Sequence, residues 1–427
     1  MEKPQIQRIN KLKLFKPEIR HLDNGIPLYI FNIGDQQISK IEINIEGGKC
    51  DGGNQAISEL SASTLREGSL KYNSEEIAEQ LDINGCCLGK STLTHCNAIN
   101  IHSINRNFEN VMPILADMTF NPTFPAKEVN NIKNVAINQL QTKLERVSFL
   151  AQTKFSQLCF GRESNLGKPF SCDTIRDTSI DDIKRFHEDW FRTPNIRIMI
   201  SGMISEEMLN CINTHFGKTP IIGKPRESQT DAATESHKGE TIIVDKNNAI
   251  QSAIAMGSST ILRSNPDYIP LRILVTALGG YFGSRLMTNI REDKGYTYGI
   301  SAYLQGFRDS AFITISSQCD TSYTWNVVKE IKSEIGKLQN EPIPSDELSR
   351  LKSHMLSDLA RILDTPFSIA EYYASMLNNR MPQNYFENQI DIINSITAVD
   401  LQAIAQKYLS ADDFFTVIAG NSSKLNG

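Results

Sequence analysis

The sequence predicts an α+β protein of two homologous domains that arose by internal duplication, each an antiparallel-rich sheet with helices packed on one face. Three observations predict this fold: strands followed by runs of helices, a long-range internal repeat, and a polar segment between the repeated halves. The 427 residues are too many for one ordinary core and suit two domains. Hydrophobic residues make up 40% and charged residues 22%, the balance of a globular protein.

The internal repeat consists of two matched pairs of segments. PTFPAKEVNNIKNVAINQL matches EPIPSDELSRLKSHMLSDL, and Pro125 aligns with Pro344 at an offset of 344 − 125 = 219. In both, a proline precedes apolar residues at helical spacing, which predicts a long helix. TSIDDIKRFHEDWFRTPNIRIMISG matches ITAVDLQAIAQKYLSADDFFTVIAG, and Asp182 aligns with Asp400 at 400 − 182 = 218. Each of these predicts a helix, a short loop and an apolar strand that ends in glycine.

The remaining elements follow from local patterns. GIPLYIFNI, KIEINIEGG and AFITISSQ alternate like strands, and TSYTWNVVKEIKSEIGKL has the spacing of a helix. SEEIAEQLDING predicts a helix with a serine cap at Ser74 and a glycine stop at Gly85. The polar stretch 219–240 lacks apolar periodicity and is interpreted as a linker, so the expected domains are residues 1–218 and 241–427.

The net charge and the distribution of apolar residues argue against several classes of protein. A net charge of −5 and a pI near 5.9 argue against a nucleic-acid-binding protein, which would need a basic face. No apolar run of about 18 residues occurs, so no membrane span is expected. The first twenty residues lack the apolar core of a secretory signal, which predicts a cytoplasmic protein, or a periplasmic one if a leader was removed.

The eight cysteines show no paired spacing and are expected to be reduced and mostly buried. One cluster, Cys86, Cys87, His95 and Cys96, has residue types that could hold a metal ion. The segment alternates like a pair of strands, however, and neighbours on a strand point to opposite faces. We therefore favour a packed hairpin over a metal site and assign the cluster no role.

The order of elements resembles the pitrilysin and insulin-degrading-enzyme family, the inverted zincins, over nearly the whole chain. Members of that family carry H-x-x-E-H on a helix of the first domain and a further glutamate on a later long helix. The two histidines and the later glutamate hold zinc, and the glutamate of the motif activates water. Aligned on Gly68, the five motif positions here are Glu59, Leu60, Ser61, Ala62 and Ser63.

The resemblance implies that this chain lacks zinc chemistry. The histidine positions hold Glu59 and Ser63, and the water-activating glutamate is replaced by Ala62. The later glutamate should fall in NVAINQL, where Asn138 and Gln139 stand. No two of the seven histidines lie three or four residues apart, the spacing that places side chains on one helix face. We therefore expect no metal and no other cofactor in this chain.

Two glutamates near the degenerate motif were considered as replacement ligands. Glu59 alone cannot hold zinc, and Glu67 lies eight residues further along the chain. Both are interpreted as solvated helix surface.

The second half keeps a different part of the family pattern. LGGYFGSRLMTNIREDKGYTYGISAYLQGF contains Arg291 and, seven residues later, Tyr298, with Gly295 between them. The resemblance implies that this pair faces the zinc across a closed chamber and binds the substrate backbone and the developing oxyanion. From the residues alone, the pair would be a helix-end arginine and a half-buried strand tyrosine. The glycine-rich turn at 279–283 lacks both phosphate-loop patterns and is interpreted as a backbone turn.

Some members of the family are heterodimers in which one half-size chain has the zinc motif and the other has the arginine–tyrosine pair. The resemblance thus implies a non-catalytic partner subunit of a zinc metallopeptidase, inactive alone, with zinc in the other subunit and a peptide as substrate. A homodimer is plausible for the isolated chain. The second hypothesis is a structural or peptide-binding scaffold of the same family. A self-sufficient zinc peptidase is disfavoured because no ligand set survives.

Overall fold

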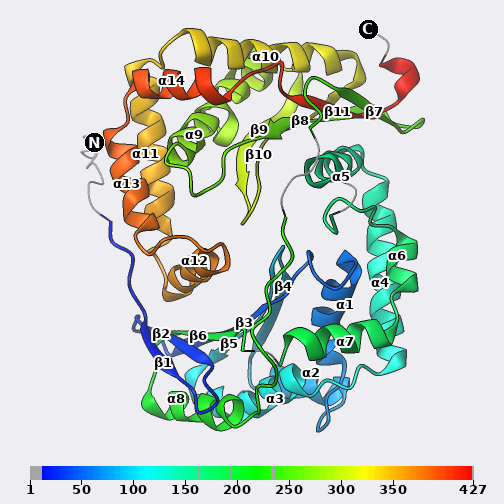
Figure 1. The fold of residues 1–427 in the computed structure, drawn as a ribbon, viewed down its shortest axis with the longest axis vertical. Coiled ribbons are helices and arrows are strands. Elements are labelled where there is room, and N and C mark those ends of the chain that lie inside the picture. Colours follow the sequence, from blue (N-terminus) through cyan, green and yellow to red (C-terminus); the bar gives the residue numbers. More distant parts are fainter. Residues whose placement is uncertain (1–11, 162–163, 193, 232–235, 426–427) are drawn as a thin grey trace.

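The structure, a computed structural model, describes residues 12–161, 164–192, 194–231 and 236–425, which form two sheet-and-helix units that face each other (Figure 1). The first sheet has the order β1-β2-β6-β3-β5-β4 and the second the order β7-β11-β8-β10-β9. In each sheet the strands are antiparallel except for one parallel pair, β2 with β6 and β11 with β7. The α+β prediction is confirmed.

The strands of the first sheet are β1 (Glu18–His21), β2 (Pro27–Asn32), β3 (Ile38–Glu46), β4 (Cys87–Thr92), β5 (Cys96–Ile104) and β6 (Ile196–Gly202). Those of the second sheet are β7 (Thr241–Asp245), β8 (Gln251–Ser259), β9 (Thr297–Gly306), β10 (Ala311–Asp320) and β11 (Phe415–Gly420). The sequence between the sheets, from Gly202 to Thr241, includes the segment 219–240 that was expected to be a linker.

Each half packs its own helices on one face of its sheet, as the pattern of the strands dictates. Along β3, the fully buried Ile41, Ile43 and Ile45 alternate with Glu42 and Asn44. The isoleucine side joins a core with the helices α1 (Gln55–Thr64), α2 (Ser74–Ile83), α3 (Phe108–Phe120), α4 (Ala126–Leu144), α6 (Cys172–Asp177), α7 (Ile180–Trp190) and α8 (Glu206–Ile212). The second sheet packs in the same way on α9 (Tyr268–Val275), α10 (Thr324–Asn340), α11 (Ser345–Arg361), α13 (Tyr385–Ser395) and α14 (Ala398–Tyr408).

The opposite face of each sheet receives a helix from the other half. Figure 1 shows α5 (Val147–Phe160) against the second sheet and α12 (Pro366–Asn378) against the first. On α5, Phe155 stacks on Phe415 with ring centroids 4.7 Å apart. On α12, Tyr373 contacts Phe31 edge to face at 5.5 Å. The two helices start 366 − 147 = 219 residues apart, which is the offset of the sequence repeat. The halves are therefore joined by a reciprocal exchange of equivalent helices.

Charged groups fill the polar face of the first sheet beneath α12. The buried Lys40 Nζ lies 2.7 Å from carboxylate oxygens of both Glu42 and Glu371, the latter on α12. Burial lowers the pKa of Lys40, but the two carboxylates outweigh it and raise that pKa above its usual value. At the far end of β3, Glu46 pairs with Arg308 of the second half. Because buried charges are tolerated only when paired, these contacts fix how the halves meet.

Within the segment 219–240, of which residues 232–235 lie outside the described part of the chain, residues 228–231 are held in place through two buried carboxylates. Asp231 is fully buried and accepts hydrogen bonds from the amides of Arg308 (3.1 Å) and Asp309 (2.8 Å) in the second half. The same carboxylate lies 2.5 Å from Nε2 of His95 in the first half. The polar composition predicted a linker between the halves, and in the structure the carboxylate of Asp231 bonds to both halves.

Asp51 anchors the preceding residues of this segment. The hydroxyl of Ser228 donates to Asp51 at 2.8 Å, and the amide of Gln229 donates to it at 3.0 Å. Burial raises the pKa of Asp51 despite these bonds. For Asp231, burial also acts to raise the pKa, but hydrogen bonds from His95 and the two amides outweigh it and hold that pKa below its ordinary value.

Several local predictions can be compared with the helix ends. Pro125 and Pro344 are the N-caps of α4 and α11, immediately before each helix. Asp182 and Asp400 each close a capping box in the first turn of α7 and α14. The predicted cap of α2 is wrong by one residue, because the side chain of Asn73, and not of Ser74, accepts the bond from Glu76.

The cysteine segment forms the predicted hairpin. In β4 and β5, Cys87 pairs with His102 at one end and Thr92 pairs with Asn97 at the other. Cys86 and Cys87 therefore lie at the opposite end of the hairpin from His95 and Cys96. Among the residues that the structure describes, no group of three or more histidine, cysteine or acidic side chains could hold a metal ion, and no helix is long and apolar enough to cross a membrane.

The buried carboxylate of Asp231, in the connecting segment 219–240, leads to a prediction about the stability of the fold. Asp231→Asn removes the negative charge to which His95 and two backbone amides are hydrogen-bonded. We therefore expect the free energy of unfolding at pH 7 to fall by about 3 kcal/mol. Because the folded-state pKa of Asp231 is lowered, its charged form stabilises the fold above the ordinary value of 3.8, and this contribution is lost as the pH falls through the folded pKa. The deficit of the variant should therefore shrink below about pH 4.

Urea denaturation from pH 3 to pH 8 measures this difference. Asp309→Asn is the matched control, since Asp309 is exposed and its carboxylate accepts only a surface hydrogen bond from Thr230. Equal stability of Asp231→Asn and the wild type at pH 7 would contradict the assigned role of Asp231.

Candidate functional site

Helix α1 carries the five positions that align with the zinc motif. It begins after Asn54, whose side chain accepts a hydrogen bond from the amide of Ile57 at 3.1 Å. Leu60, Ser61 and Ala62 are buried in the first half. Glu59 and Ser63 are partly exposed and stand four residues apart, so they share one face of the helix. The positions of the two motif histidines thus keep a common orientation.

Glu59, but not Ser63, borders a cavity of about 430 Å³ between α1, α4 and α5. Glu59 from α1 and Gln139 from α4 both line it, so the structure brings together the two separated places at which the family's zinc ligands are expected. Asn138, the neighbour of Gln139, is exposed and does not line the cavity. The lining comprises Lys49, Gln55, Glu59, Thr94, Ala136, Gln139, Leu140, Lys143, Phe149, Gln152, Thr153, Ser156, Gln157, Phe160, Leu166, Lys168, Phe170, Ile175 and Phe307.

The groups at this place do not fit a zinc ion. Glu59 is the sole carboxylate in the described lining, and it pairs with Lys49 at 2.8 Å. Gln139 offers an amide, which is a weak zinc ligand, and Ala62 cannot activate water. A catalytic zinc site needs three protein ligands, commonly histidine and carboxylate. We therefore derive no reaction step through a metal in this chain.

The two glutamates are not simple surface groups. Glu59 borders the cavity and forms an ion pair. Glu67 has a side chain only 12% exposed, with Arg66 Nε 3.2 Å away. The expectation of solvated helix surface is therefore wrong for Glu67, because the turn after α1 folds its side chain inward.

The arginine–tyrosine pair lies in the second half, away from this cavity. Arg291 belongs to a π-helical turn, Met287–Asp293, and Gly295 with φ of +65° leads into β9, where Tyr298 stands. The guanidinium carbon of Arg291 lies 4.9 Å from the ring centre of Phe282. Tyr298 is 91% exposed, so the half-buried tyrosine expected from the residues alone is wrong. The reason is that β9 is the edge strand and is irregularly paired with β10 near this residue.

The turn that carries Arg291 is held in place by contacts with helix α10. The side-chain amide of Asn289 donates to Glu330 at 3.1 Å and to Glu334 at 2.7 Å, both on α10. Lys294 also pairs with Glu330. Within the described part of the chain, neither Arg291 nor Tyr298 has a hydrogen-bond or carboxylate partner. Tyr298 is thus exposed to solvent, and the half-buried Arg291 lies on a turn that α10 holds in place.

The glycine turn before this segment packs against β9. A Cβ atom at Gly279 would lie 2.6 Å from the backbone nitrogen of Ala302, so only glycine allows this close approach. The interpretation as a backbone turn is confirmed.

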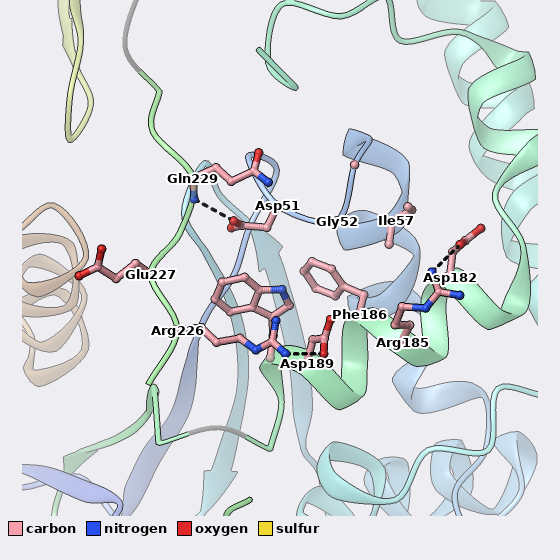
Figure 2. Close-up of a pocket in the computed structure, with 12 residues that line it drawn as sticks. Asp51, Gly52, Ile57, Asp182, Arg185, Phe186, Asp189, Arg226, Glu227 and Gln229 are labelled. Carbon is pink, nitrogen blue, oxygen red and sulfur yellow. Dashed lines mark hydrogen bonds and ion pairs between the residues drawn. The ribbon is translucent and has the colours of Figure 1, made fainter. Parts of the chain in front are cut away.

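A second cavity, of about 480 Å³, lies beside the connecting segment (Figure 2). Arg226 reaches across it to Asp189 at 2.7 Å and lies over the ring of Trp190 at 5.9 Å. Figure 2 also shows the bond from Gln229 to Asp51 at its rim. Because these charged and polar groups bind each other, the arrangement holds the connecting segment against α7.

The lysines and glutamines of the 430 Å³ cavity were missed by the sequence reasoning. On α5, Phe149, Thr153, Ser156 and Phe160 recur at helical spacing and indicate a shared face. The sequence does not reveal what that face meets, because α5 is positioned by the sheet of the other half.

Comparison with known proteins bears on both the fold and the site. Residues 177–355 match the family model described as "Peptidase M16 inactive domain", a range that includes Arg291 and Tyr298. "Uncharacterized zinc protease YmxG" of Bacillus subtilis is 22% identical over 84% of this chain and 87% of that protein. "Non-peptidase homolog YmxG" of Helicobacter pylori is 19% identical over 88% of each.

A solved structure, the peptidase M16 inactive domain from Pseudomonas fluorescens, has the same fold. It superposes with a TM-score of 0.83 at 19% identity and covers 96% of this chain and 99% of that one. The chain is thus similar to M16 peptidases, and the matched model is that of the inactive type. This similarity agrees with the missing zinc ligands on α1 and α4. The resemblance to pitrilysin-like peptidases is confirmed.

Because the residues on α1 and α4 do not fit a zinc ion, we expect the purified chain not to retain zinc. After incubation with excess zinc and desalting, the purified chain should retain well below one zinc ion, because Glu59 is paired with Lys49 and the other positions lack ligands. Atomic emission spectroscopy measures the content, and a family member with an intact H-x-x-E-H motif serves as control. Retention of about one zinc ion per chain would show that another ligand set exists.

Proposed function

We propose that this chain is the non-catalytic subunit of a heterodimeric zinc metallopeptidase, and that it forms half of an enclosed chamber. Its contribution to peptide hydrolysis is the pair Arg291 and Tyr298. One observation carries the proposal: Tyr298 is exposed on an edge strand and the half-buried Arg291 stands without a carboxylate partner on an anchored turn, while helix α1 has no ligand set for zinc.

The chemistry of the pair suits a partner's active site. Arginine provides a permanent charge with several donors, and the tyrosine hydroxyl provides a neutral donor on a rigid ring. Contact with the Phe282 ring orients the guanidinium without neutralising it, as a carboxylate would. Donors that lie where negative charge develops stabilise the transition state of amide hydrolysis. The zinc and the water-activating glutamate would come from the partner subunit.

The edge strand offers a second means of holding a peptide. One side of β9 pairs with β10, and its other side has no strand partner among the described residues. Free main-chain groups on such an edge can pair with an extended peptide. A peptide bound along β9 would pass next to Tyr298, at the start of the strand.

The second candidate function is a structural or peptide-binding scaffold without a catalytic role. The observation that favours it is the loss of every zinc-binding position, together with the likeness to a relative named as a non-peptidase homolog. In that case Arg291 and Tyr298 would be unused. The two candidates differ in whether these side chains affect hydrolysis by a complex.

The pair can be tested in the reconstituted complex. When this chain is mixed with a zinc-bearing half-size subunit from the same cell, peptide cleavage should appear or rise. Arg291→Ala or Tyr298→Phe should then lower kcat/KM by roughly 10- to 1,000-fold, because each removes a donor to the developing charge. Cleavage of a fluorogenic peptide, with and without chelator, is the measurement.

Tyr303→Phe is the matched control, since Tyr303 also lies exposed on β9 and belongs to no motif. Size-exclusion chromatography verifies that each variant still forms the complex. Full activity of both Arg291→Ala and Tyr298→Phe in an intact, active complex would exclude the catalytic contribution and leave the scaffold.

A further inference from the structure

The cavity between α1, α4 and α5 carries an excess of positive charge. Three lysines line it against one glutamate, and Lys49 is neutralised by that glutamate at 2.8 Å. Lys143 has no carboxylate partner among the described residues. Lys168 donates to the amide oxygen of Asn165 at 3.1 Å, a neutral acceptor, and has no carboxylate partner in the described part of the chain. Two exposed lysines therefore border a cavity in which, as the resemblance implies, catalytic relatives would hold a cation.

Amide groups add hydrogen-bonding capacity to the same cavity. Gln139 on α4 and Gln152 and Gln157 on α5 make no side-chain hydrogen bond within the described residues, and all three line the cavity. Gln55 donates to the backbone oxygens of Asn165 and Leu166 at 2.9 and 3.3 Å, so it is fixed in place. The three unengaged amides can each donate to an oxygen of a bound molecule.

The cavity also has an apolar part and a size suited to a small ligand. Phe149, Phe160 and Phe170 line it from the first half, and Phe307 comes from the second. Its volume of about 430 Å³ lies in the range of small-molecule sites. Phe160 packs edge to face on Phe307 at 5.2 Å, so contact between the halves shapes this wall.

We propose that this cavity binds a small organic dianion, a molecule with two carboxylates on an apolar body. The ammonium groups of Lys143 and Lys168 would each pair with one carboxylate, the glutamine amides would donate to the remaining oxygens, and the phenylalanine rings would contact the body. The lysines disfavour a cation at this place. Thus the site has the opposite charge preference to a zinc site. The proposal goes beyond the proposed function, since it needs no partner subunit.

The test uses two probes of one shape. Benzene-1,4-dicarboxylate carries two charges, and benzene-1,4-dicarboxamide is its neutral counterpart. Isothermal titration calorimetry on the full chain at low salt should show the dicarboxylate bound once per chain and at least about tenfold more tightly than the diamide. Lys143→Gln and Lys168→Gln should each weaken the dicarboxylate by roughly tenfold and leave the diamide unchanged.

Lys127→Gln is the control, because Lys127 lies on the same helix α4, has a side chain 86% exposed and is outside the cavity. It should not alter either affinity. Equal binding of the two probes, or equal weakening by Lys127→Gln and Lys143→Gln, would overturn the proposal. Unchanged thermal unfolding of each variant verifies its fold. If this binding test fails, the proposed role of Arg291 and Tyr298 is unaffected. The two proposals can therefore be rejected independently.

Discussion

The reciprocal exchange of α5 and α12 is the constraint on which the rest of this structure depends. Each half folds its own helices onto one side of its sheet, but the other side is covered by a helix of the opposite half, α12 on the first sheet and α5 on the second (Figure 1). On the second sheet this contact is apolar, with Phe155 against Phe415. On the first sheet it combines an aromatic contact, Tyr373 against Phe31, with the ion pairs of Lys40 with Glu42 and Glu371. Neither sheet is therefore complete without the other half.

This exchange also determines what the degenerate zinc region has become. Because α5 is held by the second sheet, it stands beside α1 and α4 and forms one wall of the 430 Å³ cavity. The loss of the zinc ligands on α1 and α4 leaves lysine and glutamine as the main polar groups of that cavity. Meanwhile Tyr298 projects from the edge strand β9 of the second sheet, and its hydroxyl has no hydrogen-bond partner among the residues that the structure describes. The helix exchange thus places the lysine-lined cavity and the arginine–tyrosine pair at separate positions in the molecule.

The sequence predicted what depends on local periodicity and on spacing within a segment. The alternation of β3, the prolines before α4 and α11, and the hairpin with Cys87 and Cys96 were all evident from neighbouring residues. The absence of zinc ligands followed from residue identity alone once the motif was aligned on Gly68. These features need no knowledge of how distant segments meet.

Features that arise from distant contacts were not predictable in this way. The segment 219–240 is polar like a linker, yet the carboxylate of Asp231 is fully buried because its acceptors meet donors in both halves. The burial of Glu67 and the exposure of Tyr298 likewise depend on how a turn or an edge strand is placed. Pairing of Arg308 with Glu46 joins residues 262 positions apart, which no local pattern encodes.

The most direct test of the helix exchange is whether the halves unfold together. The two tryptophans report separately, since Trp190 ends α7 in the first half and Trp325 begins α10 in the second. In Trp325→Phe and Trp190→Phe variants, fluorescence follows one half each, while far-ultraviolet circular dichroism follows the whole chain. The account predicts that fluorescence and dichroism give the same urea midpoint within each variant. Separate midpoints, with one half unfolded while the other remains folded, would contradict it.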